Sequence, residues 1–96
     1  MNLADAAHEM FDDVVGENFS IDAVGVSELE LASVEVKPSR EGASRAPFVL
    51  TFRGPADIAL PQQIYALTHD TLGQLDIFLV PVEQDDDHVI YEAVFN

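Results

Sequence analysis

The sequence predicts a mainly β domain, a six-stranded antiparallel barrel or sandwich with one amphipathic helix near its N-terminus. Six short segments rich in β-branched and aromatic residues alternate between apolar and polar positions, and turn-forming residues separate them. One segment near the start instead repeats its apolar residues with the period of a helix. The chain has 96 residues, enough for one modest hydrophobic core. We therefore expect a single domain over residues 1–96.

The helix is expected at about residues 3–15. Asn2 suits the N-cap position, and Gly16 suits the position just beyond the last turn. The apolar residues with helical spacing are Leu3, Ala6, Ala7, Met10, Phe11 and Val14. Acidic residues occupy the opposite face, so we interpret the apolar stripe as a packing face and not as a ligand site.

The strands are expected at about residues 17–22, 26–36, 47–53, 62–69, 72–83 and 88–95. In the second strand, the apolar phase slips by one residue between Leu31 and Val34. Such a slip predicts a β-bulge or a strong bend, because alternate side chains of a strand point to opposite faces.

The fifth strand contains the longest apolar run of the chain. Leu75 and Ile77 begin one apolar face, and Phe78, Val80 and Val82 make the other face apolar as well. A strand that is apolar on both faces is covered on both. The second cover is either the N-terminal helix or another subunit, and we expect the helix.

The charge is strongly acidic and uneven. The formal net charge is −14, and all four basic residues fall within residues 37–53: Lys37, Arg40, Arg45 and Arg53. We expect no binding to nucleic acid or membranes, because both recruit clustered Lys and Arg. The basic residues could meet an acidic partner or a second copy of the chain, or they could only balance nearby acids. An adaptation to a salty cell interior would give the same acidity.

Cysteine is absent, so the chain has neither a disulfide framework nor a thiolate metal site. No basic leader follows Met1, and no apolar run approaches the roughly 20 residues of a membrane-spanning helix. We expect a protein that is cytoplasmic as synthesised, with incorporation into a larger particle left open.

No catalytic motif is present, and we expect neither a cofactor nor a metal. The run at residues 85–88, Asp-Asp-Asp-His, lacks the spacing and the glycine of a calcium loop, which favours a solvated hairpin loop. His8, His69 and His88 lack zinc-ligand spacing. Tyr65 and His69 share one face of a strand, where a place at the edge of the core is expected.

Several segments together resemble a known family. They are residues 48–55, 60–62, 72–82 and 91–96, together with Tyr65 and His69. They are similar to a bacterial domain family of about this length without an assigned function, most clearly in the ending Tyr-Glu-Ala-Val-Phe-Asn. The resemblance implies a stand-alone small bacterial domain of a family whose members are often encoded beside phage-tail-like or secreted structural proteins. It supplies no catalytic residues.

We therefore expect a non-enzymatic structural or protein-interaction module, an accessory subunit of a larger assembly that binds a protein partner or itself. A phage-tail-like or secreted particle is one candidate for that assembly. The candidate partner-binding residues are Lys37, Arg40, Arg45, Arg53, Phe78, Val80 and Val82. The alternative is a small ligand- or metal-binding barrel, or a minor hydrolase, that uses Tyr65, His69 and nearby acids.

Overall fold

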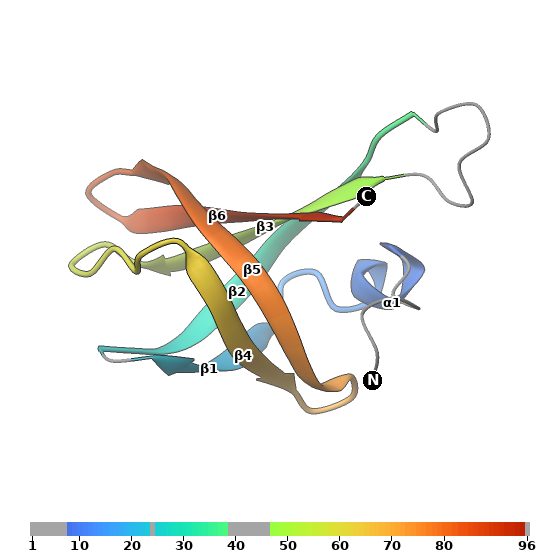
Figure 1. Ribbon diagram of the computed structural model, residues 1–96, viewed down its shortest axis with the longest axis horizontal. Coiled ribbons are helices and arrows are strands. Elements are labelled where there is room, and N and C mark those ends of the chain that lie inside the picture. The colour runs from blue at the N-terminus through green and yellow to red at the C-terminus, as the bar shows by residue number, and fades with distance from the viewer. Residues whose placement is uncertain (1–7, 24, 39–46, 96) are drawn as a thin grey trace.

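The computed structural model describes residues 8–23, 25–38 and 47–95. A short helix comes first, followed by six strands that close into an antiparallel barrel in the order β1-β2-β3-β6-β5-β4 (Figure 1). The elements are α1 (His8–Asp12), β1 (Asn18–Ala23), β2 (Val26–Val36), β3 (Phe48–Pro55), β4 (Gln63–His69), β5 (Gly73–Gln84) and β6 (His88–Phe95). The mainly β fold is confirmed, and of the two predicted architectures the barrel is the one adopted. Strand ends differ from the predicted ones by at most two residues.

Two long-range ladders close the barrel. β3 pairs with β6 along its whole length, from Phe48↔Phe95 to Pro55↔His88. β1 pairs with β4 over two residue pairs only, Ser20↔Thr68 and Ile21↔Leu67. The β1–β4 ladder has the fewest paired residues of the six ladders in the barrel wall, and we call it the thin seam.

β-Bulges bend the strands so that the wall can curve. The β2–β3 register shifts between Leu31 and Ser33, which confirms the bulge predicted from the slipped apolar phase. A second shift lies between Pro81 and Glu83, where β5 pairs with β6. Bulges increase local twist, and a closed barrel of short strands requires that twist.

The interior is filled by the inward-facing residues of all six strands. Leu75, Ile77 and Leu79 of β5 are each no more than 1% exposed, so the face that Leu75 and Ile77 begin points into the barrel. The largest fully buried side chains of the barrel are Tyr91, Phe19, Phe48, Phe52, Leu29, Leu31, Leu50, Leu67, Leu75, Ile77 and Leu79. Interdigitation of such side chains is what a small barrel needs to exclude water from its axis.

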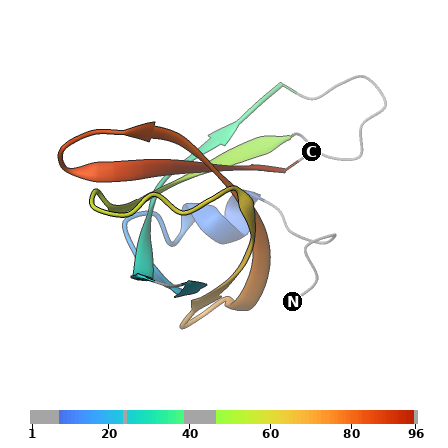
Figure 2. The ribbon, with the colours of Figure 1, turned by 60° about the vertical axis from the view of Figure 1, so that its left-hand side comes forward.

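Helix α1 closes one end of the barrel with Phe11. The Phe11 ring lies 6.0 Å from the ring of Phe48 and 5.8 Å from that of Phe95, which stack on each other at 4.7 Å. Figure 2 shows α1 behind β5, at the end where β5 and β6 separate. The Phe11 side chain is fully buried, so the helix acts as a plug.

The helix ends earlier than residue 15, where the periodicity placed its end. α1 ends at Asp12 and is followed by a turn, in which the Val14 amide donates a hydrogen bond to the Phe11 carbonyl, three residues earlier, at 3.0 Å. Gly16 then adopts a φ of 90°, a conformation that suits glycine, and its amide donates to the Leu31 carbonyl at 2.8 Å. This bond to β2 fixes the stop, and the expected start at residues 3–7 lies outside the described residues.

The expectation that the helix covers the second apolar face of β5 was wrong. Phe78 is 47% exposed and Val82 is 49% exposed. α1 packs against β2, which lies three strands away from β5 around the barrel. The physical reason is the aromatic pair Phe48–Phe95, which draws Phe11 into the barrel end and away from the outer wall.

Candidate functional site

His69 is a buried residue at the β4–β5 turn, and its ring is fully used by hydrogen bonds. Its Nδ1 accepts from the backbone amides of Thr71 at 3.0 Å and Leu72 at 3.3 Å. An accepting Nδ1 places the ring proton on Nε2, which donates to Glu17 Oε1 at 2.8 Å. The ring also contacts Phe19, with the two centroids 4.9 Å apart. The residue joins the start of β1 to the β4–β5 turn, next to the thin seam.

Tyr65 and Tyr91 also use their side-chain hydroxyls in hydrogen bonds to the backbone. The Tyr65 hydroxyl donates to the Pro61 carbonyl, and burial, the main cause, together with nearby Tyr91 raises the pKa of Tyr65 above its usual value. The Tyr91 hydroxyl accepts from the Leu60 amide at 2.9 Å. Both hydroxyls therefore hold the β3–β4 connection, and the side chains of Tyr65 and His69 are both buried.

The acidic β5–β6 hairpin uses its first carboxylate to build its own turn. Asp85 Oδ1 accepts from the amides of Asp87 and His88, both at 2.8 Å. These two bonds lower the pKa of Asp85 below its usual value. This arrangement agrees with the predicted solvated hairpin loop.

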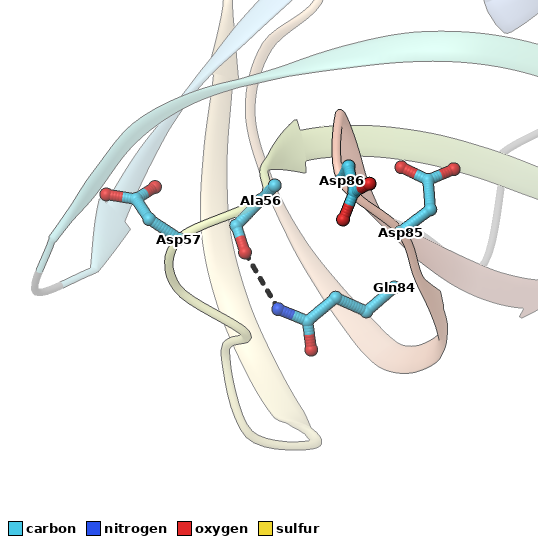
Figure 3. A pocket seen from close by; sticks show the side chains of 5 residues that line it. All are labelled: Ala56, Asp57, Gln84, Asp85 and Asp86. Carbon is cyan, nitrogen blue, oxygen red and sulfur yellow. Dashed lines mark hydrogen bonds between the residues drawn. The ribbon is translucent and has the colours of Figure 1, made fainter.

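A shallow open hollow lies beside this hairpin, lined by Ala56, Asp57, Gln84, Asp85 and Asp86 (Figure 3). The Gln84 side chain donates to the Ala56 carbonyl at 2.7 Å and ties the hairpin to the β3–β4 connection. The carboxylate of Asp57 points away from those of Asp85 and Asp86 in Figure 3. Within residues 8–23, 25–38 and 47–95, no group of three or more potential ligands is arranged to hold a metal ion.

Two of the basic candidates are paired within the chain. Arg53 Nη2 lies 3.1 Å from Glu30 Oε1 across the β2–β3 ladder, and Lys37 Nζ lies 2.7 Å from Glu35 Oε1. Arg40 and Arg45 fall outside the described residues. The structure therefore brings no two of the four bases together in the part that it describes.

The most distinctive surface is an outer apolar patch, which we define as Ile64, Phe78, Val80, Val82 and Val94. Exposure is 65% for Ile64, 60% for Val94, 49% for Val82 and 47% for Phe78, and Val80 is half-buried. These residues lie on three adjacent strands, β4, β5 and β6. Ile64 is the direct cross-strand partner of Phe78, and the two form an exposed apolar pair.

The β5 part of this patch was predicted from the sequence, whereas Ile64 and Val94 were not among the predicted residues. Both stand at alternating positions of strands that were correctly placed, so their outward direction could have been deduced. The pairing of Ile64 with Phe78 could not, because it depends on the β4–β5 register. Val94 lies two residues beyond Glu92, the last β6 partner of β5.

The fold and this surface define a small closed β-barrel domain with an apolar patch on its outer wall. The chain belongs to the family described as Domain of unknown function (DUF6916), which matches residues 6–95. The expected membership in a family of unknown function is thereby confirmed. No curated protein and no solved structure matches the chain. None of the helices in the described residues is long and apolar enough to cross a membrane.

Proposed function

We propose that this protein is a non-enzymatic protein-interaction module that binds its partner through the outer apolar patch. The observation that carries the proposal is the exposure of Ile64, Phe78, Val82 and Val94 on neighbouring strands of one wall. Single exposed apolar residues are common, but apolar residues gathered on one face mark interaction sites. The solvent face of an antiparallel sheet is ordinarily polar.

The hydrogen bonds made by Tyr65, His69 and Asp85 support the same proposal. A ligand-binding or hydrolytic barrel would use Tyr65, His69 and nearby acids, yet their hydrogen-bonding atoms hold the fold together. The carboxylate of Asp85 is occupied by its own turn. This alternative therefore has less support than the binding module.

The setting of this module is part of the proposal. We place it as an accessory subunit of a larger assembly, bacterial and cytoplasmic as synthesised, for which a phage-tail-like or secreted particle is one candidate. This setting rests on the resemblance described above. The basic residues Lys37, Arg40, Arg45 and Arg53 remain a second candidate contact, although Lys37 and Arg53 already have acidic neighbours.

Site-specific photo-cross-linking in the native producing cell tests the proposal. A benzophenone amino acid replaces Phe78 in one variant and Ile64 in another, and Glu28, an exposed residue of β2, is the control position. β2 lies on the opposite side of the barrel from β5. We expect a discrete protein adduct from positions 78 and 64 and none from position 28. Equal labelling at all three positions, or no adduct at 78 and 64, would overturn the docking role.

A further inference from the structure

Carboxylates border the outer apolar patch. Asp76 precedes Phe78 by two residues on β5, so it lies on the same outer face, and it is the partner of Ala66 on β4. Glu92 is the direct partner of Val80 and precedes Val94 by two residues on β6. The centre of the patch, formed by Ile64, Phe78 and Val80, thus has one carboxylate beside it on β5 and one on β6, and we call Asp76 and Glu92 the acidic rim.

The rim acids lack a cationic partner within the described part of the chain. Arg53 is held by Glu30 and Lys37 by Glu35, both on β2 and away from β5. Neither Asp76 nor Glu92 is paired with any described Lys, Arg or His. The formal net charge of the chain is −14, so acidic residues far outnumber basic ones.

A second copy of the chain is a poor occupant of this surface. Contact between two such patches would place the Asp76 and Glu92 rims of both copies against each other, and like charges brought together repel. The basic segment 37–46 of a second copy would supply cations. Its sequence, Lys-Pro-Ser-Arg-Glu-Gly-Ala-Ser-Arg-Ala, has no large apolar residue to bury against Phe78.

We propose that the outer apolar patch binds a basic protein segment of another protein, apolar at its centre and carrying Lys or Arg where it meets Asp76 and Glu92. This inference rests on the docking role proposed above and names the chemistry of the partner. The apolar centre excludes water when it is covered, which strengthens the attraction between the rim carboxylates and the cations of the partner. The charge of the rim selects the partner, and the apolar centre supplies most of the affinity.

Three synthetic amphipathic peptides serve as probes. The first carries leucine on one face and lysine on the other, the second replaces every lysine by glutamate, and the third replaces every leucine by serine. Binding is measured by calorimetry, and amide chemical shifts locate the contact. We expect the leucine–lysine peptide to bind with shifts centred on Ile64, Phe78 and Val94. The glutamate peptide should not bind, and the serine peptide should give no localised shifts.

Matched variants separate the rim from the overall charge. The double variant Asp76→Asn/Glu92→Gln and the control Asp13→Asn/Glu28→Gln change the net charge equally, but only the first touches the rim. Asp13 follows α1 and Glu28 is on β2, and both are exposed. We expect the rim variant to weaken binding of the leucine–lysine peptide by roughly five- to tenfold, because two interfacial ion pairs are lost. The control should change it by less than about twofold.

The outcomes distinguish this inference from the proposed function. Binding of the glutamate peptide at the patch, or equal weakening by both double variants, would overturn the basic partner while leaving the docking surface in place. Salt-sensitive self-association that competes with the leucine–lysine peptide would also overturn it, in favour of a second copy. Shifts that avoid Ile64, Phe78 and Val94 with both leucine peptides would count against the docking surface itself.

Discussion

At the scale of single residues, His69 holds together the thinnest part of the barrel wall. Its Nδ1 serves two backbone amides of the β4–β5 turn, and its Nε2 reaches Glu17 beside β1. The short β1–β4 ladder thus has a side-chain bridge at one end. We infer that His69 supports closure of the barrel.

We therefore predict that His69→Phe lowers the free energy of unfolding by about 1–3 kcal/mol, because the ring contact with Phe19 is kept while the Thr71 and Leu72 amides lose their acceptor. Urea denaturation measures the loss. His88→Phe is the matched control, with an expected change within about 0.5 kcal/mol. Equal stability of the His69 variant and the parent protein would show that these hydrogen bonds do not support the fold.

Asp85 gives a second prediction, on pH. Its two backbone hydrogen bonds favour the carboxylate, so its folded pKa lies below the ordinary value of 3.8. A lowered folded pKa means that its contribution to stability is present above the unfolded pKa and is lost as pH falls through the folded one. An NMR titration should place the Asp85 carboxyl midpoint below 3.8, and the Asp87 and His88 amides should follow the same midpoint. A midpoint above 3.8 would contradict the hydrogen-bonded turn.

At the scale of elements, α1 is short, and it contributes to the stability of the barrel mainly through the side chain of Phe11. Phe11 packs on Phe48 and Phe95 at the barrel end. We predict that Phe11→Ala lowers the free energy of unfolding by about 3–5 kcal/mol, the typical cost of truncating a buried phenylalanine. Chemical denaturation measures it. Val15→Ala, at a residue 45% exposed in the following turn, should cost less than about 0.5 kcal/mol. Similar costs for both variants would show that Phe11 is not a plug.

Elements differ in how far the sequence predicts them. The six strands and the bulge near Ser33 follow from local alternation, and both are present. The place of α1 does not follow from local pattern. An apolar helix face and an apolar strand face of matching size predict contact between the two. In the structure, Phe11 packs instead on the stacked rings of Phe48 and Phe95 at the end of the barrel. That pair forms across the β3–β6 ladder, between residues distant in sequence.

At the scale of the whole molecule, closure of the barrel determines which surface remains apolar. The outward pairs, such as Ile64 with Phe78, depend on strand order and register, so the sequence revealed only the β5 part of the patch. Tyr65 and His69 were correctly expected at the core edge, but the partner Glu17 lies far from His69 in sequence. The acidic residues of the strands remain on the outer surface, where Asp76 and Glu92 lie beside the outer apolar patch.

Native mass spectrometry of the protein isolated from its own cell shows whether the outer apolar patch holds a foreign protein. Three forms are compared: the parent chain, Phe78→Ser, and the control Val36→Ser, at a residue of β2 that is 44% exposed. We predict a heteromeric complex for the parent and the control, and a monomer for Phe78→Ser. A complex that persists in Phe78→Ser, or a monomer in all three forms, would show that the outer apolar patch does not hold a partner.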